Sequence, residues 1–155
     1  METVRTVRDL LRGRELQLYR ISPQDTVFDA LQEMARRNVG ALPVMEGDEL
    51  VGIFSERDYA RKVILHGRSS KEMHVNEIMS TRVAYVRPHQ TIDDCMALMT
   101  RLRIRHLPVI DGEKVTGMIS MRDVVEDIIS EKDFIIEQLV NYIQIERSPA
   151  SPIRP

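Results

Sequence analysis

The feature that most constrains this chain is an internal repeat. Residues 39–58 return as residues 104–123 without a gap, at a constant offset of 65 positions. Both copies carry Leu-Pro-Val, then a glycine, a second glycine five positions later, and a closing Ser-x-Arg-Asp. A repeat at a fixed period decides the architecture before local propensities do. One copy is too short to close a good core, so the 155 residues are predicted to form two equivalent units that pack together.

Each copy has the pattern strand, helix, strand, strand, helix. In the first copy, residues 18–23 are predicted to form a short strand that ends at Pro23. A helix begins at Thr26, which has the form of a capping box with Asp29. Two strands joined by a turn follow, and a second helix covers residues 55–65. The stripe of the first helix that would face the core consists of Val27, Ala30, Leu31 and Met34.

The second copy repeats this order. Its first strand is predicted at residues 82–86, its first helix begins at Thr91, and its second helix begins at Ser120. Cys95 takes the place of Ala30 on the apolar face of the first helix. Free cysteine is often buried as a small hydrophobic residue, so Cys95 is predicted to fill the core and not to react.

We therefore predict an α+β fold in which two βαββα repeats pack with pseudo-twofold symmetry, with further helices at the two ends. The N-terminal segment is basic and partly helical, and it is expected to dock on the body. The predicted divisions are a lead-in helix at 1–17, a first repeat with its linker at 18–72, a second repeat at 73–130, a C-terminal helix at 131–147, and a tail at 148–155.

Composition excludes several classes of partner. The net charge is −2 and the chain has no Trp and only three Phe, which argues against binding of nucleic acid or of an anionic membrane. No apolar run is long enough to span a bilayer, and the single cysteine allows no internal disulfide. The expected location is the cytoplasm, and an organellar protein whose targeting segment has been removed is the alternative.

The repeated Ser-x-x-Asp junction is the candidate binding site. Ser55 and Ser120 each follow a strand and open a helix, and a helix N-terminus attracts phosphate. Asp58 and Asp123 lie one turn further on, where a carboxylate can hold the two hydroxyls of a ribose. Taken alone, the same pattern is a capping box, which is the structural alternative. The ligand class suggested by this chemistry is a phosphorylated ribonucleoside.

Motifs of common enzymes are absent. The chain has no P-loop, no G-x-G-x-x-G and no nucleophile elbow. Its four histidines are scattered without the spacing of metal ligands, so no metal site is predicted. Ser120, His106 and Asp123 do not have the order of contacts that a hydrolytic triad needs. We predict that the chain is not an enzyme and has no catalytic cofactor.

The paired Leu-Pro-Val strands, the Gly-x-x-Ser-x-x-Asp junctions and the βαββα order resemble a tandem cystathionine-β-synthase (CBS) domain pair, or Bateman module, over roughly residues 18–130. The resemblance implies a homodimer that binds AMP, ADP or ATP, or else NAD(H) or S-adenosylmethionine, and regulates a partner protein. The site residues that it implies are Ser55, Asp58, Ser120, Asp123, Arg105, His106, Arg122, Val39, Gly40, Ala41, Ile104, Leu18, Tyr19, Val83 and Ala84.

The two copies differ beside the strands. The second has Arg105 and His106 where the first has Gly40 and Ala41. The resemblance implies that Arg105 and His106 reach phosphates, either in their own site or in the site of the other copy. Both copies keep the aspartate, so we predict two ribose pockets, with the higher affinity at Asp123. A structural dimerisation module with vestigial sites is the alternative from another class.

Overall fold

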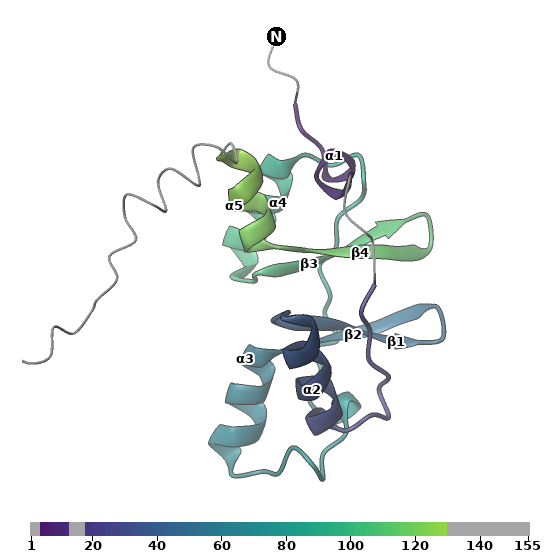
Figure 1. Cartoon of the computed structure of the whole chain (residues 1–155), viewed down its shortest axis with the longest axis vertical. Helices are drawn as coiled ribbons and strands as arrows, with labels where there is room; N and C mark the ends of the chain where they lie inside the picture. The colour runs from purple at the N-terminus through teal and green to yellow at the C-terminus, as the bar shows by residue number, and fades with distance from the viewer. Residues whose placement is uncertain (1–3, 13–17, 130–155) are drawn as a thin grey trace, which may run out of the picture. The chain divides into compact units, whose positions relative to one another are not determined.

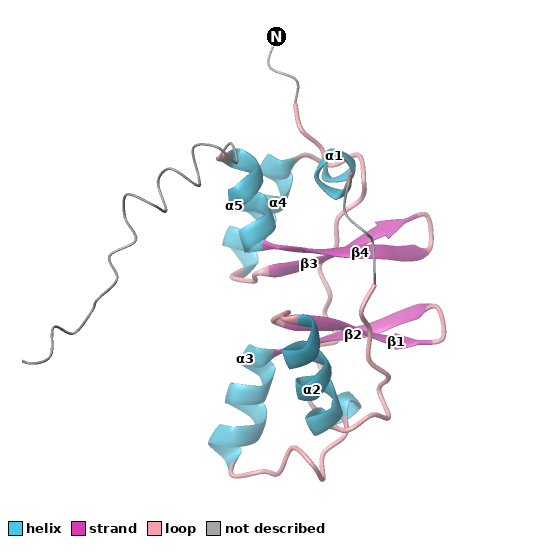
Figure 2. Ribbon diagram, viewed as in Figure 1, coloured by secondary structure: helices cyan, strands magenta, loops and turns pink. Residues whose placement is uncertain are grey.

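The computed structural model describes residues 4–12 and 18–129. The chain divides into two units, residues 1–124 and residues 125–155. The first unit holds the two repeats, and only the end of the last helix is described in the second. The predicted C-terminal helix at 131–147 and the tail at 148–155 lie outside the described residues. Figures 1 and 2 show the elements of the chain.

The α+β prediction is confirmed, because the two repeats contain the same elements at the same offset. The first contains α2 (Val27–Arg37), β1 (Ala41–Glu46), β2 (Glu49–Ser55) and a continuous helical run of α3 (Glu56–Asp58), η1 (Tyr59–Val63) and η2 (Ile64–His66). The second contains α4 (Ile92–Leu102), β3 (His106–Asp111), β4 (Lys114–Ser120) and α5 (Met121–Ile128). The helical run after β2 is π-helical over η1 and 3₁₀ over η2, whereas α5 is α-helical throughout.

Local chemistry explains where the elements begin and turn. Thr26 and Thr91 cap α2 and α4 as predicted, and each threonine Oγ1 accepts the backbone N–H three residues later at 3.1 Å. Each hairpin is antiparallel and turns at a glycine with positive φ, +61° at Gly47 and +63° at Gly112. In Figure 1, α2 and α3 lie on one side of the β1–β2 hairpin.

The first strand of each repeat is shorter than predicted. It is reduced to one parallel bridge, Ile21 to Val44 in the first repeat and Val86 to Val109 in the second. Prolines explain this, because the next ladder bond on either side would need an N–H from the proline of Leu-Pro-Val or from the proline two residues after the bridge. Those positions are Pro43 and Pro23 in the first repeat, and Pro108 and Pro88 in the second.

The core of each repeat is completed by a segment from outside it. α1 (Val7–Leu11) buries its apolar side chains in the second repeat, with the Val7 N–H donating to Gln90 O at 2.8 Å. The linker between the repeats does the same for the first repeat through Met73, Val75 and Ile78.

These two completing segments correspond in sequence. Thr6-Val-Arg-Asp-Leu-Leu11 matches His74-Val-Asn-Glu-Ile-Met79, where η3 (Val75–Glu77) forms. Docking of the N-terminal segment on the body was predicted from the sequence, but neither this second repeat nor the choice of the repeat on which each segment packs was predicted.

The predicted burial of Cys95 in the core is confirmed. The residue is 0% exposed within the core of the second repeat. Burial is the main cause that raises the pKa of its thiol to about 11, so the reactive thiolate is scarce at neutral pH.

Candidate functional site

A cleft of about 890 Å³ lies within the first unit and is lined by residues of both repeats. It brings together part of the predicted site. The predicted residues that line it are Gly40, Ala41, Ser55, Asp58, Val83, Ala84, Ile104, Arg105 and His106. Other predicted residues are not among those that line it, namely Leu18, Tyr19, Val39, Ser120, Arg122 and Asp123.

Asp58 is the most buried charged group in this cleft, with 8% of its surface exposed. Its Oδ2 accepts the backbone N–H and the hydroxyl of Ser55, each at 3.0 Å, while its own N–H donates to Ser55 Oγ at 3.2 Å. This is the reciprocal capping box that the structural alternative predicted. The cap fixes the carboxylate where β2 ends and α3 begins.

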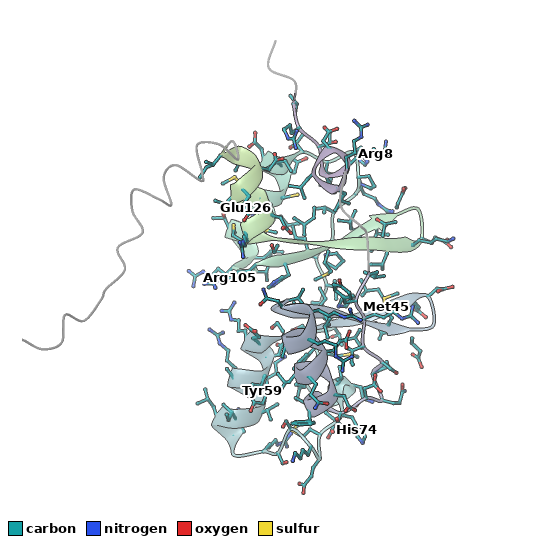
Figure 3. The ribbon with its side chains drawn as sticks, viewed as in Figure 1. Arg8, Met45, Tyr59, His74, Arg105 and Glu126 are labelled. Atoms are coloured by element: carbon teal, nitrogen blue, oxygen red, sulfur yellow. The ribbon has the colours of Figure 1, made fainter. Side chains whose placement is uncertain are left out.

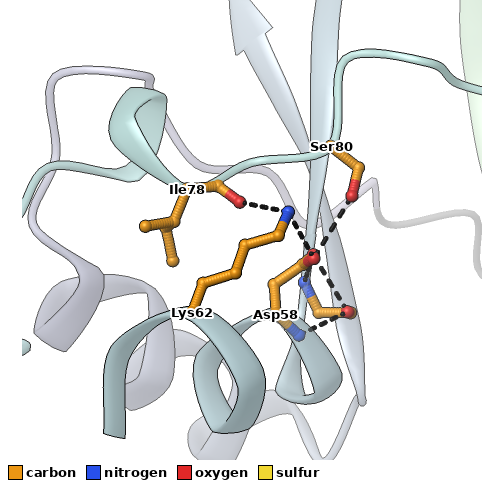
Figure 4. Close-up of polar contacts among 5 residues, drawn as sticks. Asp58, Lys62, Ile78 and Ser80 are labelled. Carbon is orange, nitrogen blue, oxygen red and sulfur yellow. Dashed lines mark hydrogen bonds and ion pairs between the residues drawn. The ribbon is translucent and has the colours of Figure 1, made fainter. Parts of the chain in front are cut away.

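The second oxygen of Asp58 is held by two residues that the sequence analysis did not select. Oδ1 accepts the Ser80 hydroxyl at 3.2 Å and lies 3.0 Å from Lys62 Nζ, which also donates to Ile78 O at 2.9 Å (Figure 4). Lys62 could have been found in the sequence, because it lies four residues after Asp58 on a helix. Ser80 could not, since it comes from the linker and reaches Asp58 only through tertiary folding.

The cleft is strongly basic. Beyond Lys62 and Arg105, four further arginines line it, and the only carboxylates that do so are Glu56 and Asp58; the arginines are Arg57, Arg61, Arg82 and Arg103. Guanidinium groups bind phosphate well, and a cleft of one sign concentrates anions. Figure 3 labels Arg105, which is exposed on the second repeat.

Two contacts join the repeats beside the cleft. Arg57 Nη1 donates to Arg103 O at 2.7 Å, at the residue that caps the C-terminus of α4. A Cβ placed on Gly40 would lie 3.2 Å from His106 Cε1 and 3.3 Å from Nε2. The small residue at position 40 therefore leaves room for the imidazole of the other repeat.

His106 is half-buried, and burial is the main cause that lowers its pKa, against the opposing charges of Glu56 and Asp123. The lowered pKa favours a neutral imidazole at pH 7. His106 can then exchange hydrogen bonds with a ligand, but the positive charge predicted for this pair of residues comes from Arg105.

The junction of the second repeat has the same local geometry in a different place. The Ser120 N–H donates to Asp123 Oδ2 at 2.7 Å, and the Asp123 N–H donates to Ser120 Oγ at 3.1 Å. Tyr19 is another predicted residue that does not line the cleft, and it has the Arg37 guanidinium 4.6 Å from its ring centroid. Arg103, Arg105 and His106 of the second repeat line the cleft that contains Asp58, the aspartate of the first.

Neither a metal-binding group nor a membrane-spanning helix is found among the described residues. In the part of the chain that the structure describes, no group of three or more His, Cys, Asp or Glu side chains could hold a metal ion. Over residues 4–12 and 18–129, no helix combines the length and hydropathy needed to cross a membrane.

Two such repeats with a cleft lined by both define a tandem-repeat module with a candidate ligand-binding cleft. The model of the CBS domain family matches residues 7–64 and 75–130, and the chain belongs to this family. The two matches begin at Val7 and Val75, the corresponding positions of the two completing segments.

Similar proteins agree with this assignment. The chain is 44% identical over 125 residues to the CBS domain-containing protein CBSX3, mitochondrial, of Arabidopsis thaliana; the alignment covers 77% of this chain and 61% of that protein, so this chain spans about three fifths of that relative. The structure of a CBS-domain protein from Burkholderia ambifaria MC40-6 is 49% identical, with a TM-score of 0.78 over 80% of this chain and 93% of that one.

A more distant structure shares the fold. The CBS domain pair of protein MJ0100, solved with 5′-methylthioadenosine and S-adenosyl-L-methionine, is 22% identical, with a TM-score of 0.69 over 81% of this chain and 97% of that one. At this identity the likeness concerns the fold alone.

Proposed function

We propose that this chain is a regulatory sensor that binds an adenine nucleotide, AMP, ADP or ATP, in the Asp58 cleft and modulates a partner protein. The observation that carries the proposal is the meeting of a buried, capped carboxylate with a basic cleft of about 890 Å³. The carboxylate suits ribose hydroxyls, and the surrounding guanidinium groups suit phosphates. Membership of the CBS domain family adds the expectation of an adenosine-bearing ligand.

In the proposed complex, Asp58 accepts the ribose hydroxyls and Ser55 lies near phosphate. The backbones at Val83–Ala84 and at Ile104 would line the base. From the sequence, the higher affinity was predicted at Asp123 because Arg105 and His106 are in the second repeat. Since both line the Asp58 cleft, we now propose that Asp58 marks the tighter site and Asp123, with Ser120 and Arg122, the weaker one.

Regulation would follow from a difference in ligand affinity between two arrangements of the module or of its homodimer. The proposed action is binding and not catalysis, and incubation with ATP and magnesium should release no phosphate. The homodimer, the regulated partner and the cytoplasmic location remain predictions. NAD(H) and S-adenosylmethionine are the alternative ligands, and the MJ0100 complex supports the latter for this fold.

A thermal-shift panel with AMP, ADP, ATP, NADH and S-adenosylmethionine tests the proposal, on wild type, Asp58→Asn and Asp123→Asn. A ligand at a hundred times its Kd should stabilise the protein by about 2.7 kcal/mol. We expect the shift with an adenine nucleotide to disappear in Asp58→Asn and to persist in Asp123→Asn. No shift with any ligand in folded protein would instead favour a dimerisation module with vestigial sites.

A further inference from the structure

Both oxygens of the Asp58 carboxylate are already engaged in this structure. A carboxylate offers about four lone-pair sites on its two oxygens. Oδ2 accepts the N–H and the hydroxyl of Ser55, while Oδ1 accepts the Ser80 hydroxyl and forms an ion pair with the Lys62 ammonium. Two ribose hydroxyls can therefore bind Asp58 only if existing donors leave it.

The donors on Oδ1 are the ones that can leave. Those on Oδ2 come from Ser55, which caps α3, so their loss would expose the start of the helix. Lys62 belongs to the π-helical η1, and its side chain is 44% exposed, against 10% for that of Asp58. Its ammonium is on a flexible four-carbon stem and can move while its backbone stays in place.

Displacing Lys62 has a cost that depends on what the ligand supplies. If a ligand offers only hydroxyl groups, Asp58 keeps its hydrogen bonds, but the ammonium loses its carboxylate partner inside a cleft that already contains five arginines. If the ligand also carries a phosphate, that phosphate can accept the ammonium in a charge-assisted hydrogen bond. The ion pair is then exchanged and not lost.

We propose that Lys62 is a specificity-determining residue that restricts the Asp58 site to phosphorylated nucleosides, by passing from Asp58 to the ligand's phosphate as the ribose takes its place. This rests on the proposed function and narrows its ligand class. Nucleosides without phosphate are rejected, and so is S-adenosylmethionine, which lacks phosphate and carries a positive sulfonium into a basic cleft.

The selectivity belongs to the first site alone. The position equivalent to Lys62 in the second repeat is Asp127, an acid at the same offset of 65 residues. The Asp123 site therefore has no lysine four residues after its aspartate, and the exchange cannot occur there in the same form.

Isothermal titration with adenosine, AMP, ATP and S-adenosylmethionine tests this on wild type and Lys62→Met. Wild type should bind the best nucleotide at least about tenfold more tightly than adenosine, since a charge-assisted hydrogen bond contributes roughly that factor. Lys62→Met should bind adenosine more tightly than wild type and the nucleotide more weakly. This change in opposite directions is the signature of an exchange. Lys114→Met, in the β3–β4 hairpin and outside the cleft, is the matched control.

The other results would overturn the inference. If Lys62→Met weakens the binding of adenosine and of the nucleotide in parallel, or leaves the ratio of the two affinities unchanged, Lys62 does not discriminate between them. In that case, loss of nucleotide binding in Asp58→Asn would still support the proposed sensor function. If wild type prefers adenosine or S-adenosylmethionine, the selectivity is wrong. If it binds none of the four, both proposals fail. Lys62→Gln repeats the test should the methionine variant melt below wild type.

Discussion

The two repeats have the same backbone plan but surround their aspartates differently. Asp58 and Asp123 both accept the N–H of the serine three residues earlier, so the local cap is the same. Around Asp58, however, Ser80 of the linker and Lys62 of η1 both contact the second carboxylate oxygen. The cleft around this carboxylate is also lined by basic residues of the second repeat. The comparison teaches that a repeated motif fixes a local geometry, whereas the residues brought to it from elsewhere give each copy its chemistry.

The same comparison applies to the cores. Each repeat lacks part of its own hydrophobic core and receives it from a short segment that lies beyond its neighbour or between the two. The module is therefore more interdependent than two repeats in a row would suggest.

Shortening a buried side chain of either completing segment should have the largest effect on stability. Leu10→Ala and Ile78→Ala each remove a buried side chain, 6% and 3% exposed, and each should lower the free energy of unfolding by about 2–5 kcal/mol in urea titration. Hydrogen exchange should separate them: Leu10→Ala should reduce protection of the Ile110 amide in the second repeat more than that of the Met45 amide in the first.

Ile78→Ala should have the reverse pattern of exchange. Leu102→Ala, at a residue that is 47% exposed, is the control and should change stability little. If both truncations reduce protection of the two amides equally, the completing segments do not act on the repeats that they contact.

Two glycines allow a matched test of the contacts around the cleft. A Cβ on Gly52 would lie 2.7 Å from Met79 Sδ and 3.0 Å from the backbone oxygen of Ser80, so Gly52→Ala should destabilise the protein by about 1–3 kcal/mol. The three atoms nearest to a Cβ on Gly40 belong to the side chains of His106 and Glu56 and lie at 3.2 Å or more, so Gly40→Ala should cost about 0.5 kcal/mol. Equal costs in thermal unfolding would contradict this order.

Arg57→Ala tests the direct hydrogen bond between the repeats. The guanidinium donates to the carbonyl of Arg103 at the C-terminal end of α4, where a cation is favourable, and the loss should be about 0.3–1 kcal/mol. The effect should shrink at high salt, because the pair is exposed. Arg61→Ala, which removes a cation lining the same cleft, should leave stability nearly unchanged in the same urea titrations.

His106 should give the smallest effect, visible in the pH dependence of stability. Its pKa in the folded protein is lowered from 6.5, mainly by burial. As the pH falls through 6.5, the unfolded chain therefore takes up a proton that the folded protein resists, and stability decreases. Wild type should lose more stability than His106→Gln between pH 7 and pH 5, and identical slopes for the two would show that His106 does not contribute.

Much of the fold could be predicted from the sequence because it depends on neighbours. The capping boxes at Thr26 and Thr91, the glycine turns and the burial of Cys95 all follow from residues within one or two turns of the chain. The short first strands were missed although their cause is also in the sequence. The Leu-Pro-Val motif predicts a strand in each repeat, but Pro43 and Pro108 cannot donate an N–H across the ladder.

The candidate site divided along the same line. The Ser55–Asp58 pair was found from its spacing, but the higher affinity was assigned to Asp123 because Arg105 and His106 follow in the same copy of the sequence. In the structure these two residues line the cleft of Asp58. Sequence order left open which of the two sites they would serve, since residues of one repeat can face the site of the other when the two are packed together.

The sequence by itself determined that this protein has two equivalent units, which elements each contains, and where each helix is capped. These features depend on hydrogen bonds and side-chain periodicity over a few residues, which every copy of the motif forms in the same way. Tertiary packing decided which segment completes which core, which cations surround Asp58, and that Lys62 and Ser80 both contact its Oδ1. Those contacts join residues far apart in the chain or depend on a particular helical geometry, and they exist only once both repeats are packed.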